Sequence, residues 1–491
     1  MVIDDRRRIA HLLRRAGFGG SATELEEYVA LGFEGSLDRL LHPEAATEPD
    51  LDAAVAALGL EPSGPGAIQI QWLYRMVHTQ RPLAEKLALF WHGHFATSVE
   101  KVKSVTMMWE QYELLRDQGL GHFADLALAV SRDPAMLVWL DNWRSKAEAP
   151  NENYAREFLE LFTLGIGNYT EADVKAAARA FTGWSITILT DAQIGDEDAP
   201  PDEELLPQDD GLTDDERAKR DRAAERRSRD AEFTFRPAWH DDAEKTFLGE
   251  TGAWDGDDIV RIVATQPACA AFIARKLFAF FVWDDPSEED VAPYATVFTE
   301  SGGDIRSVLA ALFASDEFSS DRAYRAKVKS PVELIVNTLK LLGMDPPLDV
   351  NNRKGGAIVA LGQIPFAPPN VGGWTSGLGW IGPSTILGRY NLVLELLGGA
   401  DKRRKNQSSA FDAEAFLAGA PIATATDLVD LMVDRVLEGD IAPDQRTALI
   451  SYVAGTGSER QEAISPGDPR FEEKLHGLIR LTMSIPTYQL A

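Results

Sequence analysis

Apolar residues recur three and four positions apart along most of the chain, which is the spacing of helices that bury one face. Helix start signals accompany this pattern, and the clearest runs from Ser330 to Glu333, with an N-cap serine, a first-turn proline and a third-position glutamate. Apolar and polar residues alternate only briefly, from Phe233 to Phe235. We therefore predict a mostly α fold, a large multi-helix body with a small β-hairpin element near residues 231–250.

Composition divides the chain into segments. Residues 191–230 contain fifteen Asp or Glu, seven Lys or Arg and almost no large apolar side chain. Such a segment cannot bury enough surface to offset its ordering entropy, so we predict a mobile acidic insertion there. A basic and polar stretch from Lys402 to Ser409 is typical of a linker. The predicted organisation is a main helical domain over 1–400, interrupted at about 191–230, and a C-terminal helical extension over 401–491 packed on it.

Charge and cysteine content exclude some classes of protein. The net charge of −28 disfavours nucleic acid or an anionic membrane as the main partner, because the summed field repels a polyanion. Cys269 is the only cysteine, so no intramolecular disulfide can form. No segment reaches the roughly 18 to 20 apolar residues of a membrane span. Basic residues and His11 interrupt what would be the apolar core of a signal peptide, so we expect a cytoplasmic location.

The stretch from Asn151 to Gly167 is predicted to be a mostly buried helix that nevertheless carries charge. Glu152, Arg156 and Glu160 follow one another at i,i+4 on a narrow polar stripe. Glu157 projects between apolar neighbours, where burial is expected to raise the pKa of its carboxyl group. Two interpretations remain open: a structural ladder of Glu152, Arg156 and Glu160, or an acid/base pair that includes Glu157.

Two histidines flank Gly93 at the end of another predicted helix. On a continuous helix His92 and His94 would point about 160° apart and could not share a metal ion. If the helix ends at Gly93, the two imidazoles could converge, together with His240 or a carboxylate, on zinc, iron or manganese. The alternative is a helix cap with a satisfied polar contact, and the spacing matches no established metal signature.

Aromatic residues and a proline-rich loop supply candidate binding positions. The loop from Gly362 to Trp374 contains three prolines, which deny it helix and regular sheet pairing. Trp91, Trp184, Trp374 and Asn370 are candidates for contacting a substrate such as a sugar ring, although burial in a core is the alternative for the tryptophans. The sequence contains no phosphate-binding glycine loop, nucleophile elbow or dinucleotide motif.

Six motifs in order resemble one bacterial family, the domain of unknown function 1800 family. They are His11–Gly19, Trp91–Phe95, Asn151–Glu157, Phe181–Trp184, His240–Asp241 with Lys245, and Pro368–Trp374. The resemblance spans nearly the whole chain, to the terminal Pro-Thr-Tyr-Gln-Leu. It implies no established chemistry. Family members are implied to be exported and to be encoded beside a sulfatase-like partner protein, so export and such a partner are expectations that come from the resemblance alone.

Three functions are consistent with these observations. The first is a hydrolase-like enzyme in which the His92/His94 loop, the central helix, the turn at His240 and the proline-rich loop meet at one Trp-lined cleft. Its candidate catalytic residues are Glu157, Glu152, Arg156 and Asp241. The second is an enzyme that depends on a divalent metal held by His92, His94 and His240. The third is a non-catalytic binding or assembly partner of a sulfatase-like protein.

Overall fold

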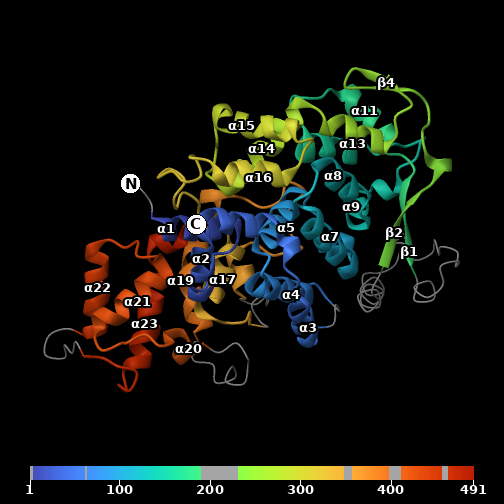
Figure 1. The fold of residues 1–491 in the computed structure, drawn as a ribbon. Coiled ribbons are helices and arrows are strands. Elements are labelled where there is room, and N and C mark those ends of the chain that lie inside the picture. Colours follow the sequence, from blue (N-terminus) through green and yellow to red (C-terminus); the bar gives the residue numbers. More distant parts are fainter. Residues whose placement is uncertain (1–3, 61–63, 190–229, 348–355, 398–410, 456–462) are drawn as a thin grey trace.

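The computed structural model describes residues 4–60, 64–189, 230–347, 356–397, 411–455 and 463–491. These residues are mostly helical, as predicted. The mobile insertion expected at 191–230 and the linker expected at 402–409 lie outside the described residues, apart from Asp230. Figure 1 shows an extended helical body, with the β-strands at one end and α22 (Pro443–Ala454) at the other.

The first part of the chain forms the blue and teal helices of Figure 1, which run from α1 through the middle of the molecule to α8 and α9 near the strands. In chain order they are α1 (Asp5–Ala16), α2 (Ala22–Leu41), α3 (Pro49–Ala57), α4 (Pro65–His78), α5 (Pro82–His94), α6 (Val99–Val102), α7 (Val105–Gln118), α8 (Phe123–Arg132) and α9 (Pro134–Trp139). Helix α5 is the most buried of them, with only Gly93 less than fully covered. It therefore lies in the core of the molecule, where its side chains contact several other helices.

The middle of the chain contains the central helix, the strands and a second group of helices. These elements are α10 (Glu152–Glu157), η3 (Phe158–Thr163), α11 (Glu171–Ala180), β1 (Trp184–Leu189), β2 (Asp230–Phe235), β3 (Lys245–Phe247), β4 (Glu250–Gly252), α13 (Gly256–Ala264), α14 (Pro267–Phe281), α15 (Glu288–Glu300) and α16 (Ile305–Ala314). The hairpin expected near 231–250 is present in part, because β3 pairs antiparallel with β4. Strand β2 instead pairs with β1, with Trp184 opposite Phe235, so the sheet reaches back across the acidic insertion.

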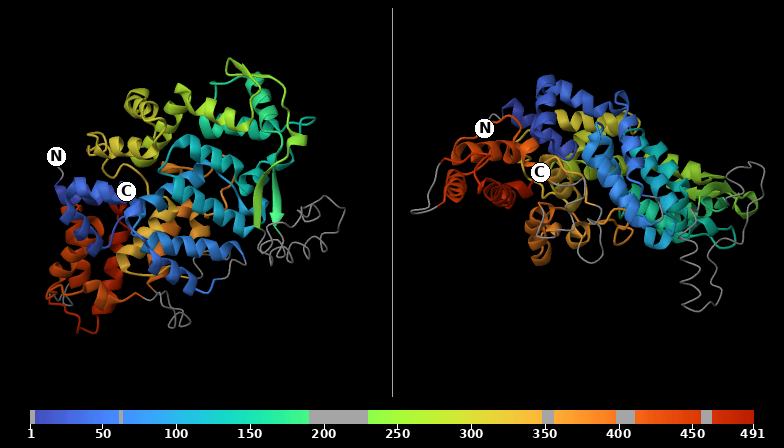
Figure 2. Two further views of the ribbon diagram at one scale, coloured as in Figure 1. Left: turned by 45° about the vertical axis from the view of Figure 1, so that its right-hand side comes forward. Right: turned by 90° about the horizontal axis from the view of Figure 1, so that it is seen from below.

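The remaining helices are α17 (Pro331–Leu342), α18 (Ala357–Leu361), η6 (Gly377–Trp380), α19 (Pro383–Leu396), α20 (Ala413–Leu417), α21 (Ala425–Leu437), α22 and α23 (Phe471–Met483). The predicted start of α17 is confirmed: the Ser330 hydroxyl accepts from the Glu333 amide, and the Glu333 carboxylate accepts from the Ser330 amide at 2.6 Å. The two views of Figure 2 show the C-terminal helices beside α1, at the end of the molecule away from the strands. The two ends of the chain therefore pack against each other.

Candidate functional site

The central helix has the predicted ends and an unpredicted second half. The Asn151 side chain caps its start by accepting hydrogen bonds from the amides of Asn153 and Tyr154. Gly165, with a left-handed φ of 76°, follows its end. Residues Phe158–Thr163 are wound as a π-helix rather than an α-helix. Such a stretch holds one residue more per turn than an α-helix and is frequent at functional sites.

The charged residues of this helix face α11 and solvent. Arg156 makes a two-bond ion pair with Glu171, at 2.7 and 2.8 Å, so the expected ladder of Glu152, Arg156 and Glu160 is not formed. Glu152 is exposed, and Glu160 accepts a hydrogen bond from the Tyr169 hydroxyl. Arg156 therefore pairs with a residue of a neighbouring helix and not with one of its own helix. The i,i+4 spacing in the sequence could not show this.

Glu157 is half-buried. Burial, and then the charge of Glu160, raise the pKa of the Glu157 carboxyl group, which is the direction expected from the sequence. A raised pKa suits a general acid, but it also results when a carboxylate simply sits beside another. The residues of the central helix that were proposed as catalytic, Glu152, Arg156 and Glu157, do not line the large cavity described below.

The turn at His240 is held by α11 and the segment after it. Nδ1 of His240 lies 2.9 Å from the carbonyl oxygen of Thr182, and Asp241 makes a two-bond ion pair with Arg179 at 2.6 and 3.1 Å. The hydrogen bonds from Arg179 hold the pKa of Asp241 below its usual range. This turn does not line the large cavity either, so the convergence of all four segments on one cleft stays a prediction.

His92 and His94 point to different parts of the fold, because α5 does not end at Gly93 but runs on to His94. Nε2 of His92 accepts a hydrogen bond from the Phe366 amide at 3.0 Å. Nε2 of His94 lies 2.9 Å from the Phe162 carbonyl oxygen, so this nitrogen carries the proton. The condition for their convergence on one metal ion is therefore not met.

Burial keeps both imidazoles neutral. Burial lowers the pKa of His92 to about 3. The pKa of His94 is also far below its usual value, because of burial and the nearby charge of Lys276. Nδ1 of His94 has no hydrogen-bond partner among the described residues. His94 thus has one spare acceptor atom and stands on a wall of the cavity described next.

A cavity of about 260 Å³ lies between α5, α14, the start of α17 and the segment from Gly372 to Trp380. We call it the aromatic cavity. Its aromatic lining is Phe90, Phe280, Trp374 and Trp380, and its ionisable lining is His94, Lys276, Asp284, Lys327 and Glu333. The end of the proline-rich loop and the end of α5 meet here, as the sequence motifs suggested.

Close backbone packing brings these two segments together. A Cβ atom added at Gly373 would lie 2.1 Å from the Gly93 carbonyl oxygen, and Gly373 has a φ of 80°, so only glycine fits there. The Trp374 ring then lies over Gly93 and edge-on to His92, with ring centroids 5.2 Å apart. The two glycines therefore place a tryptophan on the wall of the cavity.

Most charges of the aromatic cavity are paired. Lys327 forms an ion pair with Asp284 at 2.5 Å and also donates to the Ala279 carbonyl oxygen. Glu333 pairs with Lys86, which holds the pKa of this carboxylate below its usual value despite burial. Lys276 is different, because it forms no hydrogen bond or ion pair with any described residue and only stands 5.0 Å from the Phe272 ring. Burial alone lowers the pKa of Lys276 to about 8.

The structure places only some of the proposed binding residues at this cavity. Trp374 lines it, whereas Trp91 and Trp184 are almost completely buried in the core. The Trp91 indole donates to the Gly119 carbonyl oxygen, and Trp184 packs edge-on against Phe181. Asn370 is exposed and accepts from the Gly372 amide, so it shapes the turn before Trp374.

Sequence reasoning missed Lys276, although one signal was available. Lys276 lies four residues after Phe272 and four before Phe280, so on a helix it shares a face with two aromatic residues. A lysine inside an aromatic stripe is rarely buried without a carboxylate partner. Lys327, Asp284 and Glu333 gave no comparable signal, because their partners lie far away in the sequence.

Within the described ranges, no group of three or more His, Cys, Asp or Glu side chains is placed to hold a metal ion. Metal ligation by His92, His94 and His240 therefore stays a prediction. In the same ranges no single helix is both long and apolar enough to cross a membrane, and α13 with α14 passes only as a pair bent by 72°.

Comparison with known proteins identifies a family and nothing closer. No curated protein and no solved structure matches the chain significantly. A family model described as "Protein of unknown function (DUF1800)" matches residues 11–490, which is nearly the whole sequence and includes all six motifs. The chain therefore belongs to the DUF1800 family.

Proposed function

We propose that this protein binds a small organic molecule, carrying a ring and an acidic group, in the aromatic cavity. The observation that carries the proposal is the Lys276 ammonium group, which stands on the cavity wall and has no carboxylate partner among the described residues. A cation removed from water is unfavourable unless it is paired. An acidic group on the ligand would supply the missing partner.

The balance of charge around the cavity supports an anion rather than a cation. Asp284 and Glu333 are each neutralised by a lysine, Lys327 and Lys86, so neither carboxylate is free to attract a positive ligand. Lys276 remains as the surplus charge. Although the protein carries a net charge of −28, this part of its interior is locally positive. The local field therefore favours an acidic ligand at this position.

The size and the walls of the cavity support a ring. An engineered protein cavity of about 150 Å³ accommodates benzene. The aromatic cavity, at about 260 Å³, is large enough for a substituted ring. Trp374 and Trp380 are part of its lining, and indole faces stack well on sugar or aromatic rings. Acidic sugars and aromatic acids are therefore the two classes to test first.

Hydrolysis is the second candidate function, and it is favoured by two carboxylates that line the same cavity. Because the pKa of Glu333 is lowered, Glu333 would act as a base or nucleophile and not as an acid. Lys276, with a pKa of about 8, would then be the proton donor. This assignment replaces Glu157, Glu152, Arg156 and Asp241 with residues that face the cavity. Metal-dependent catalysis and capture of a sulfatase-like partner remain alternatives that rest on the sequence alone.

The test is calorimetric titration with matched acidic and neutral compounds. Glucuronate is compared with glucose, and benzoate with benzamide. We expect the acid of at least one pair to bind, and Lys276→Gln to weaken it about tenfold or more, because a charge-assisted hydrogen bond contributes about 1.5–3 kcal/mol. Lys276→Arg, which keeps the charge, is expected to retain the preference for the acid.

Two results would count against the proposal. One is binding of the acid and its neutral analogue with equal affinity. The other is binding of the acid that Lys276→Gln leaves unchanged. Turnover of a glycoside of the preferred acid, lost in Glu333→Gln, would extend the proposal to hydrolysis. If the acid binds but no glycoside of it is turned over, the protein is a binding protein and not a hydrolase.

A further inference from the structure

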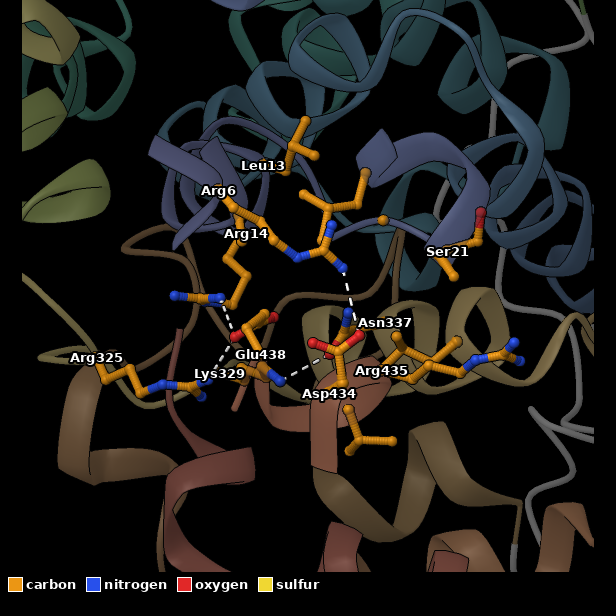
Figure 3. Close-up of a pocket in the computed structure, with 17 residues that line it drawn as sticks. Arg6, Leu13, Arg14, Ser21, Arg325, Lys329, Asn337, Asp434, Arg435 and Glu438 are labelled. Carbon is orange, nitrogen blue, oxygen red and sulfur yellow. Dashed lines mark hydrogen bonds and ion pairs between the residues drawn. The ribbon is translucent and has the colours of Figure 1, made fainter. Parts of the chain in front are cut away.

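A second cluster of charged residues lies where α1 meets α17 and α21 (Figure 3), and it shares no lining residue with the aromatic cavity. Glu438 is the acid at its centre, with a side chain that is 14% exposed, and it accepts from Arg14 at 2.6 Å and from Arg325 at 2.5 Å. Lys329 is also buried here, but it donates to the Asn337 side chain and the Tyr488 carbonyl oxygen, both of which are neutral. Three buried cations thus surround one largely covered carboxylate.

The other acids near this cluster are too exposed to complete the balance. Asp440 reaches Arg325 at 3.0 Å, but its side chain is 39% exposed. Asp434 pairs only with Arg6, at 3.5 Å, and is 58% exposed. Water and salt screen such charges, so they compensate a buried cation poorly.

Arg14 is the cation whose hydrogen bonds are incomplete. Its side chain is only 4% exposed, and its Nε and Nη2 atoms have no hydrogen-bond partner among the described residues. Buried donors without partners are rare in native proteins, and an ordered water or ion commonly satisfies them. The Arg14 guanidinium group therefore needs an acceptor that the described chain does not provide.

Arg14 lines a small hollow together with Arg6, Arg325, Lys329, Asn337 and Glu438, which we call the Arg14 hollow (Figure 3). Its volume is about 20 Å³. One water needs about 10–15 Å³, so a single water or a monatomic ion fits and an organic molecule does not. Cations outnumber acids in the lining, so an anion is favoured over a neutral water.

We propose that the Arg14 hollow binds a single monatomic anion, chloride under ordinary conditions. The anion would accept hydrogen bonds from Arg14 and offset the surplus charge of Arg325 and Lys329. Since Arg14 belongs to α1 and Glu438 follows α21, the anion would help to fasten the first helix to the C-terminal helices. This site is independent of the aromatic cavity and does not rest on the function proposed for it.

The first test uses the full-length wild-type protein and bromide as a probe. Crystals soaked in sodium bromide are expected to show an anomalous peak in the Arg14 hollow. The melting temperature is expected to rise and level off as chloride replaces gluconate at constant ionic strength, because a ligand that binds only the folded state stabilises it. Bromide should replace chloride, whereas sulfate should not, because it is too large.

The outcomes separate three possibilities. A peak together with a saturable rise in melting temperature supports the proposal. Ordered density without an anomalous signal, and a melting temperature that is the same in chloride and gluconate, would mean a water and overturn the proposal. A peak without any chloride effect on melting would mean an adventitious ion only, and it would overturn the proposal as well.

A pair of variants assigns the effect to this hollow. Arg14→Gln is expected to lose the chloride-dependent shift in melting temperature, whereas Arg6→Gln, at the exposed rim of the same hollow, is expected to keep it. If both variants lose the shift equally, or both keep it, the anion does not bind at Arg14. If Arg14→Gln does not fold, the bromide soak of the wild-type protein still decides.

Discussion

The aromatic cavity and the Arg14 hollow are both lined by cations that are at least partly buried, but they differ in the volume that those cations line. In the hollow, Arg14 and Arg325 are packed against Glu438 around a volume of about 20 Å³. In the aromatic cavity, Lys276 lines a volume of about 260 Å³ and forms no ion pair with any residue in the described part of the chain. The same kind of charge is therefore part of an ion-pair network in one place and lies at an open wall in the other.

This difference separates a structural role from a binding role. A charge that forms buried ion pairs is strongly coupled to its partners, so removing one partner leaves the others buried and uncompensated. An unpartnered charge on a cavity wall has no such coupling within the fold. Its removal should change the protein's stability little and its ligand binding a great deal.

The largest effect is expected from Glu438→Gln. This change removes the buried carboxylate that pairs with both Arg14 and Arg325, and losing one partner of a buried ion pair costs about 3–5 kcal/mol. Asp440→Asn is the matched control, because Asp440 contacts the same arginine from an exposed position and should cost under about 1 kcal/mol. Urea unfolding of both variants measures the difference. Equal losses of unfolding free energy in the two variants would show that the ion pairs of Glu438 do not contribute more to stability than the exposed contact of Asp440.

Gly373→Ala should be nearly as damaging, because the wall of the aromatic cavity depends on the approach of Gly373 to Gly93. The new Cβ would lie 2.1 Å from the Gly93 carbonyl oxygen at a φ of 80°, and we expect a loss of about 2–4 kcal/mol. Gly372→Ala is the control, because its nearest neighbour is the Asn370 side chain at 3.1 Å and its φ is not positive. Thermal unfolding should separate the two variants clearly.

Acid should destabilise the α5 end of the aromatic cavity. The folded-state pKa of His92, about 3, lies below its unfolded value, so the unfolded state binds more protons and stability falls as pH drops from about 6.5 towards 3. The slope is about 1.4 kcal/mol per pH unit for each such histidine. His92→Gln, which can still accept from the Phe366 amide, should show a shallower slope in urea unfolding between pH 7 and 4. Parallel slopes would mean that His92 is protonated in the folded protein.

Lys276→Met should have the smallest effect on stability. It removes an ammonium group that no described residue pairs with, so the free energy of unfolding should change by under about 1 kcal/mol in either direction. Lys327→Met, in the same cavity, leaves Asp284 without its partner and should cost more. Chemical denaturation of the two variants compares the paired and the unpaired lysine directly.

The helices were predictable because their signals are local. The capping residues of α17, the N-cap Asn151 and the left-handed Gly165 can be read within a few residues of each helix end. The pairing of β1 with β2 could not be predicted, because the two strands lie on either side of residues 190–229 and the sequence of one strand does not identify the strand that pairs with it. The π-helix at Phe158–Thr163 also has no pattern that separates it from an α-helix.

The candidate site was predictable only in outline. The motifs at His94 and Trp374 did indicate segments that meet, since both residues line the aromatic cavity. Helix periodicity could not show that Arg156 pairs with Glu171, or that Arg179 holds Asp241, because those partners lie on other elements. For the same reason, the sequence directed attention to Glu157 instead of Lys276, which matters because no described residue pairs with it.

The most direct test of the central claim is the pH dependence of ligand affinity. The probe is the tightest-binding acid among glucuronate and benzoate, titrated by calorimetry between pH 6.5 and 9.5. Since the pKa of Lys276 is about 8, we predict that affinity falls above this pH, by up to about tenfold per pH unit, as the lysine loses its proton. Lys276→Arg should bind with an affinity that does not change over this range. A constant affinity in the wild-type protein would contradict the assignment of Lys276 as the group that holds the acid.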